Sequence, residues 1–165
     1  MSVRNGVEEG GRSVIEAIKR QFGSIWSGLR DGISKCSEEL WRDRDNPRSA
    51  PSRLAYHTVQ TVEYYLGNSR KFDWNARFSV NWEHGDIDDL PSKEQLLAYI
   101  DEIEAAVQQR LQNATPEQLA GPDPGPWGFQ SAAERWLYIL RHSQHHLGQM
   151  AMVLRRAGLE PGVWR

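Results

Sequence analysis

Two histidines four residues apart, His142 and His146, are the residues of this sequence best suited to metal chemistry. They lie in segment 140–149, which holds three of the five histidines and is predicted to be helical. Residues at this spacing share one helix face, with Cβ atoms about 5 to 6 Å apart, so their imidazoles can bind one ion. His145 is offset by one position and is expected to point elsewhere, in an outer or surface role. Because two ligands rarely hold a metal alone, a third must come from another segment.

The composition describes one ordinary globular domain. At 165 residues the chain can bury roughly two thirds of its unfolded surface, enough for a core without metals or disulfides. A net charge of -2, from 20 basic and 22 acidic residues well mixed, predicts no nucleic-acid partner and no membrane-binding face. Cys36 is the single cysteine, which excludes a disulfide framework and a thiolate zinc site. No segment has the pattern of a signal peptide or membrane span, so we expect a cytoplasmic protein.

The first predicted helix begins near Ser13, a candidate N-cap with Glu16 three residues later. Residues 1–12 before it are polar and are expected to form a flexible tail, so the predicted domain covers residues 13–165. Apolar residues then recur every three or four positions from Ile15 to Leu40, which is typical of a bundle helix. Cys36 lies on this stripe and is expected to be a small buried hydrophobe.

A second helix is predicted from Pro51 to about Gly67 and carries the candidate third ligand. Within it His57 lies on one line with Leu54 and Tyr65, so it shares an apolar face. A lone histidine there would usually be a hydrogen-bonded core residue. The pair of histidines in the last helix is what makes His57 a candidate ligand.

Residues 68–91 form a long irregular connection that is rich in aromatic side chains. Connections of this length often line binding sites, but a flap packed over one end of the bundle explains the aromatics equally well. His84 stands between acidic residues beside Gly85, and an exposed turn is the favoured interpretation over a pocket residue.

Two further helices complete the pattern. Ser92 opens one that runs to about Asn113, whose acidic residues (Asp101, Glu102 and Glu104) are expected on a solvated outer face. Thr115 is expected to start a short turn before the Gly- and Pro-rich loop 121–126. Ser131 then caps the last helix, which is predicted to end near Ala157.

Four amphipathic segments of this kind predict an all-α fold, a four-helix bundle with a long irregular connection between its second and third helices. The second and fourth helices can face each other, which would bring His57 towards His142 and His146. Three histidines leave coordination positions open, as in catalytic or substrate-binding metal sites, and no carboxylate is placed to complete the set.

The combination of a histidine in the second helix with the later run His142-x-x-x-His146-x-Gly148-Gln149 resembles the DinB-like superfamily. The tail Leu154-Arg-Arg-Ala-Gly158 and the Pro91-Ser92 entry to the third helix are also similar to that family. The resemblance covers nearly the whole chain from about residue 13. It implies a four-helix bundle that binds divalent metal, commonly zinc, nickel or iron, through His57, His142 and His146. It also implies a homodimer.

The resemblance leaves several reactions open. Relatives include S-transferases and isomerases that use low-molecular-weight thiols, and others are described as metal-dependent hydrolases. Residue 143 is Ser where an H-E-x-x-H peptidase carries its Glu base, and the paired Glu-x-x-His motifs of di-iron bundles are absent from the sequence. Our leading hypothesis is therefore an enzyme whose ion activates a thiol cosubstrate for transfer to a small electrophile. The alternatives are a hydrolase of a small substrate and a non-catalytic metal- or ligand-binding bundle.

Overall fold

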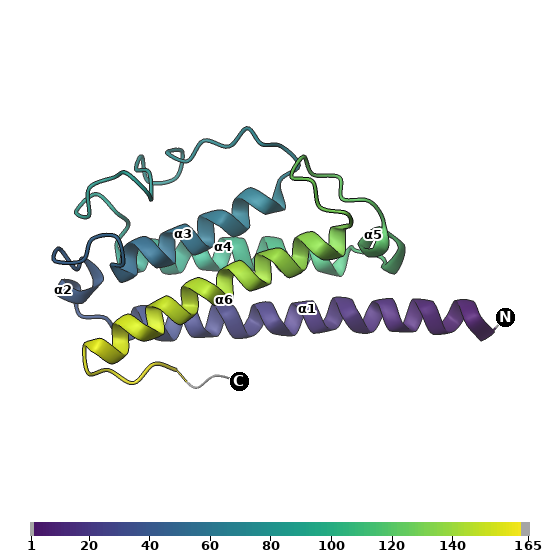
Figure 1. Cartoon of the computed structure of the whole chain (residues 1–165), viewed down its shortest axis with the longest axis horizontal. Helices are drawn as coiled ribbons and strands as arrows, with labels where there is room; N and C mark the ends of the chain where they lie inside the picture. The colour runs from purple at the N-terminus through teal and green to yellow at the C-terminus, as the bar shows by residue number, and fades with distance from the viewer. Residues whose placement is uncertain (1, 163–165) are drawn as a thin grey trace.

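The computed structural model describes residues 2–162, which contain six α-helices and no strand. They are α1 (Ser2–Lys35), α2 (Glu38–Trp41), α3 (Pro51–Leu66), α4 (Lys93–Gln112), α5 (Pro116–Ala120) and α6 (Ala132–Arg156). The four long helices pack as a bundle in which α6 contacts α1 and α3, and α4 contacts the same two helices (Figure 1). The predicted all-α four-helix bundle is confirmed, with α2 and α5 as short additions. The outer predicted limits, Met1 and residues 163–165, lie outside the described residues.

The core is built from the apolar stripes that the sequence pattern predicts. On α1 the stripe from Ile15 to Ile33 is buried, and Phe22 packs edge-on against Trp136 of α6 with ring centroids 5.6 Å apart. Cys36 is buried as expected, its thiol donating to the carbonyl of Gly32 at 3.3 Å. Burial raises the pKa of this thiol to about 11, so it behaves as a hydrophobe at neutral pH.

The predicted start of the first helix is wrong. α1 begins at Ser2, so residues 2–12, predicted as a flexible tail, form its first turns and Ser13 is no N-cap. The extension contacts α5, because a Cβ added to Gly11 would lie 2.4 Å from Cβ of Pro116. Such a contact between distant segments cannot be read from local capping signals.

The predicted end of that helix is wrong as well. α1 ends at Lys35, whereas the apolar stripe continues to Leu40. Ser37 interrupts the helix, since its hydroxyl accepts a hydrogen bond from the backbone N–H of Leu40 and caps α2. The other predicted helix ends are confirmed within a residue or two, including the capping box at Ser92, the cap at Ser131 and the short helix that follows Thr115.

The connection between α3 and α4 is irregular, as predicted, and arches over α3 (Figure 1). Polar side chains of α3 hold it in place. Arg53 donates to the carbonyls of Trp82 and Gly85, and Gln60 donates to that of Trp74 at 3.1 Å. The hydroxyl of Tyr56 lies 2.8 Å from the carbonyl oxygen of Arg77. Buried α3 donors thus satisfy backbone carbonyls that have no partner in a strand or helix.

Arg135, near the start of α6, joins three segments of the chain. Its Nη1 donates to the backbone carbonyls of Tyr65 and Gly67 at the end of α3, at 3.3 and 3.1 Å. Its Nε lies 2.9 Å from Oδ1 of Asp123, an ion pair without the alignment of a hydrogen bond. The two side chains are 6% and 0% exposed, so this pair is desolvated. Arg135 therefore fixes α6 against α3 and against the loop that precedes α6.

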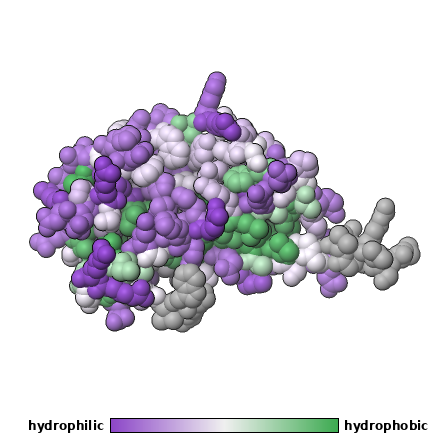
Figure 2. Space-filling model, viewed as in Figure 1, coloured by the Kyte–Doolittle hydropathy of each residue, from purple (hydrophilic) through white to green (hydrophobic). Residues whose placement is uncertain are grey.

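The surface is largely polar. Figure 2 shows hydrophilic residues over most of one face, with hydrophobic residues in separate patches. Leu137 and Met152 of α6 are exposed large hydrophobic residues, at 59% and 49%. Within residues 2–162, every helix is too short or too polar to cross a lipid bilayer.

Replacing Arg135 by Met is expected to lower the free energy of unfolding by about 3 kcal/mol or more, because Asp123 would be left buried without its cation. Arg44→Met is the control, since it breaks an exposed pair with Asp88 and should cost less than about 1 kcal/mol. Urea unfolding followed by circular dichroism measures both. Equal losses for the two variants would contradict the role assigned to Arg135.

Candidate metal centre

The structure brings His57 of α3 together with His142 and His146 of α6, as the sequence predicts. The ring centroid of His57 lies 5.0 Å from that of His142 and 4.5 Å from that of His146, and the latter two are 4.5 Å apart. One nitrogen from each ring can be chosen so that all three lie within 4.8 Å of one another. The two helices that carry these histidines, α3 and α6, have the most extensive contact of any helix pair in the bundle. This contact brings together residues that are 85 positions apart in the sequence.

The nitrogens of the α6 pair have the spacing that one ion requires. Nε2 of His142 lies 3.2 Å from Nε2 of His146. Two imidazole nitrogens at about 2.0 to 2.1 Å from a tetrahedral zinc ion are about 3.3 to 3.4 Å apart. The donor set and this distance therefore fit a small divalent ion without rearrangement of α6.

Two neighbouring side chains orient the imidazoles. Nδ1 of His146 is 2.7 Å from Oε1 of Gln149, which can only accept, so we assign the proton to Nδ1 and a free lone pair to Nε2. Nδ1 of His57 is 3.4 Å from the hydroxyl of Thr61. The role of Gln149 was not predicted; its position three residues after His146 on the same helix face is the sequence signal for this hydrogen bond.

Aromatic side chains stand on two sides of the histidines. The ring of Trp82, from the irregular connection, lies 3.7 Å from that of His57, at an interplanar angle of 35°. Tyr138 lies one turn before His142 and stacks towards it, with centroids 6.1 Å apart. Both interpretations of the connection hold in part: Trp82 lines the site, while Val80, Ile87 and Leu90 are buried in the core.

The remaining two histidines stay outside the group. The side chain of His84 is 77% exposed beside Glu83, in the turn that the sequence favours. His145 is exposed on α6, with its ring 5.0 Å from that of His146. Neither belongs to the group of possible ligands formed by the described residues.

Burial keeps the three imidazoles neutral. Desolvation, followed by the proximity of the other two histidines, lowers the pKa of His57 to about 3. Desolvation and the proximity of His146 lower the pKa of His142 to about 4, and desolvation also lowers the pKa of His146. Neutral imidazole is the form that binds metal, so all three are ready to do so near neutral pH.

No carboxylate joins the three histidines within the described residues. Asp101 and Glu102 are exposed as predicted and pair with Arg30 and Arg77, respectively. Glu104 was also predicted on the solvated face, but it is only partly exposed because it pairs with Arg30 of α1. The group that could hold a metal therefore consists of uncharged ligands alone.

A family model described as the DinB superfamily matches residues 21–150, which include all three histidines and most of the bundle. The chain belongs to the DinB superfamily. A comparison with curated proteins found no match. The membership agrees with the helical fold and with the three-histidine group of the structure.

The metal-free protein should lose stability as the pH falls from about 6.5 towards 4. In the unfolded chain the imidazoles titrate near pH 6.5, whereas in the fold the pKa of His57 is about 3, so the unfolded state binds more protons across this interval. Urea unfolding of chelator-treated protein gives the free energy of unfolding at about pH 7.5 and about pH 5. Between these two pH values, His57→Gln should lose up to about 2 kcal/mol less of this free energy than the wild type does. His84→Asn, which alters an exposed histidine, should leave the wild-type loss unchanged. The pKa assignment fails if the His57→Gln variant shows the full loss.

Proposed function

We propose that this DinB superfamily member is a metal-dependent enzyme in which a divalent ion on His57, His142 and His146 activates a thiol cosubstrate for transfer to a small electrophile. The observation that carries the proposal is a ligand group of three neutral imidazoles with no carboxylate. Zinc, nickel and iron all accept imidazole ligands, and each is a candidate for the ion.

The lack of a carboxylate beside the three histidines in the described residues favours thiol transfer over hydrolysis. An ion held by three uncharged ligands keeps its full positive charge and open positions, and supplies thiolate or hydroxide near neutral pH. Hydrolysis of a peptide-like bond usually also needs a side chain that passes a proton to the leaving group. Ser143 takes the position of the Glu base of zinc peptidases, and it is fully buried. A thiol transfer in which the leaving group departs as a stable anion does not need such a side chain.

The aromatic neighbours of the histidines suit an apolar electrophile. The aromatic ring of Trp82 lies beside His57, and that of Tyr138 lies beside His142. Such faces bind apolar groups and exclude water from the thiolate. In the transfer, the thiolate sulfur forms a bond to the electrophilic carbon while the leaving group departs with its electron pair.

The wild-type protein is expected to bind one equivalent of zinc or nickel per chain, and His57→Ala is expected to lose this binding. Gln149→Met should weaken metal affinity by roughly 10- to 100-fold, because His146 would lose the acceptor that holds its Nδ1 proton. His84→Ala is the control and should bind as the wild type does. Elemental analysis of protein purified without added metal, followed by calorimetric titration, measures occupancy. A wild-type protein that carries no metal and gains none overturns the site.

Metal-loaded protein should accelerate the reaction of a low-molecular-weight thiol with a model electrophile, and chelator-treated protein and His146→Ala should not. The assay uses a panel of bacterial thiols with 1-chloro-2,4-dinitrobenzene, and a nitrophenyl ester as the substrate for hydrolysis. Ester hydrolysis without thiol transfer would favour the hydrolase. Stoichiometric metal with no turnover of either kind would indicate a non-catalytic binding protein and would refute the proposed reaction.

A further inference from the structure

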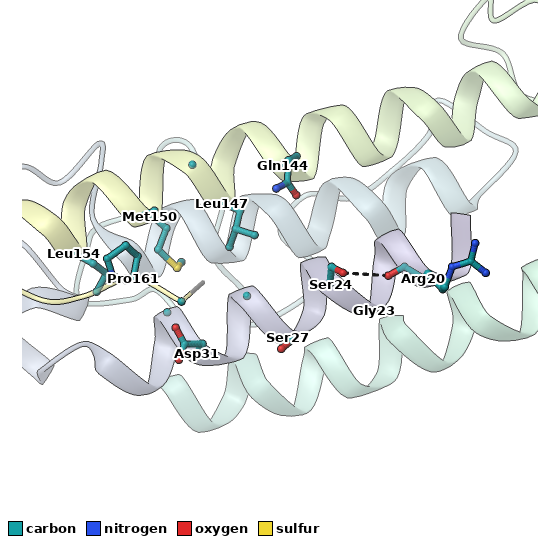
Figure 3. Close-up of a pocket in the computed structure, with 15 residues that line it drawn as sticks. Arg20, Gly23, Ser24, Ser27, Asp31, Gln144, Leu147, Met150, Leu154 and Pro161 are labelled. Carbon is teal, nitrogen blue, oxygen red and sulfur yellow. Dashed lines mark hydrogen bonds between the residues drawn. The ribbon is translucent and has the colours of Figure 1, made fainter. Parts of the chain in front are cut away.

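Helix α6 has three sides with different surroundings. One side faces α1 across a groove of about 600 Å³, lined in part by Leu147 (Figure 3). A second side packs on α3 and carries His142 and His146. The third side is exposed to solvent and carries Arg141 and His145. This exposed side adjoins the candidate metal centre, because each of these two residues directly precedes one of the candidate ligands in the chain.

Arg141 places a positive charge at the edge of the histidine group. Its Cζ lies over the ring of Tyr138, 5.4 Å from the ring centroid, and the same ring stacks towards His142. A cation–π contact of this kind holds the guanidinium in place without using its N–H donors. Within the described residues Arg141 forms no ion pair, whereas Arg77 and Arg135 each pair with a carboxylate. Its donors are therefore available to a ligand.

The charge of Arg141 acts on the histidine group. Burial is the main cause of the low pKa of His142, about 4, and the proximity of two further histidines and of Arg141 lowers it as well. No carboxylate of the described residues joins the three histidines to balance this charge. A divalent ion on neutral ligands adds two further positive charges when it is bound. The combined field favours a substrate with a negative group.

We propose that Arg141 is a specificity-determining residue, which binds the carboxylate of an anionic thiol cosubstrate beside the three-histidine group. A guanidinium binds a carboxylate through two parallel N–H···O hydrogen bonds, which fix its orientation as well as its position. A neutral thiol lacks this second point of attachment. The anionic group is assigned to the thiol because the aromatic rings beside the histidines suit an apolar electrophile. The inference rests on the proposed function, since it names the class of thiol that the transfer uses.

Two thiols of similar size test the assignment: 3-mercaptopropionate, which has a carboxylate, and 2-mercaptoethanol, which has none. In the assay with 1-chloro-2,4-dinitrobenzene and zinc-loaded protein, the sulfur forms a bond to the ring carbon, chloride leaves with its electron pair and the thiol proton passes to solvent. Arg141→Gln should raise KM for 3-mercaptopropionate by about tenfold or more with kcat little changed, because a charge-assisted hydrogen-bonded pair is lost. KM for 2-mercaptoethanol should not change. Arg141→Lys keeps the charge without the bidentate geometry and should give an intermediate KM.

Matched controls separate substrate binding from structural support. Arg155→Gln removes an exposed charge from the last turn of α6 and should change neither KM. Calorimetric titration of the zinc-loaded protein measures the dissociation constants of the two thiols without turnover. It should show the same change in Arg141→Gln for 3-mercaptopropionate alone. Elemental analysis and circular dichroism should show that this variant retains its zinc and its helices.

Each other outcome overturns the inference, and the outcomes distinguish it from the proposed function. If the wild type uses 2-mercaptoethanol at least as well, or if Arg141→Gln weakens both thiols equally or loses its zinc, the inference fails while the proposed transfer stands. A preference for the anionic thiol that Arg141→Gln leaves unchanged also overturns it, because the charge of the ion would then account for the preference. If neither thiol reacts faster with zinc-loaded wild type than with chelator-treated protein, the proposed function fails and this inference fails with it.

Discussion

The register between α3 and α6 depends on one guanidinium. Nη1 of Arg135 donates to the carbonyl of Tyr65 in the last turn of α3 and to that of Gly67 directly after it, while Nε pairs with buried Asp123. Arg135 lies two helical turns before His142, and Tyr65 lies about two turns after His57. A slip of α3 by one turn, about 5.4 Å, would move His57 out of reach of the α6 pair. Arg135 thus supports the geometry of the histidine group from about 10 Å along α6, by a contact that involves none of the three histidines.

The three histidines lower the stability of the same interface between α3 and α6. A core interface gains stability from apolar side chains, yet here three imidazoles share the space, and desolvation lowers the pKa of each. Nδ1 of His142 is buried without a hydrogen-bond partner. The contacts that offset these costs are nearby: Gln149 and Thr61 hold the other two rings, and Trp82 covers His57. The interface therefore holds three candidate ligands together at some cost in stability.

The features that depend on local helical periodicity could be predicted from the sequence. The shared face of His142 and His146, the exposed positions of Asp101 and Glu102 and the capping box at Ser92 could be predicted, because helical spacing alone fixes which residues share a face. The extension of α1 to Ser2 could not be predicted, because it packs against α5 through a contact between Gly11 and Pro116. The split at Ser37 was missed because the apolar stripe runs on across the break.

Contacts made over long separations could not be read from the sequence at all. Arg135 appeared as one charged residue among 20 basic ones, and nothing local shows that its partners are carbonyls of a helix 70 positions earlier. Trp82 was one aromatic among several in an irregular segment, and only the folding of the connection over α3 places it on His57. The residues that hold a site in position are thus harder to predict than the residues that could bind a metal. Metal binding restricts the residue type to a few side chains, whereas many residue types can position a neighbour.

The core of the bundle is independent of the histidine group. Phe22, Trp26 and Leu29 of α1 are at most 1% exposed and pack within a continuous cluster that includes residues of α4 and α6. A domain of this size with such a core does not need metal binding for folding, unlike small zinc domains that are unfolded without their ion. The neutral, partly desolvated imidazoles can therefore exist without an ion in an otherwise intact fold. The affinity of an ion bound by these histidines would therefore come from the placement of the three side chains and not from coupling to folding.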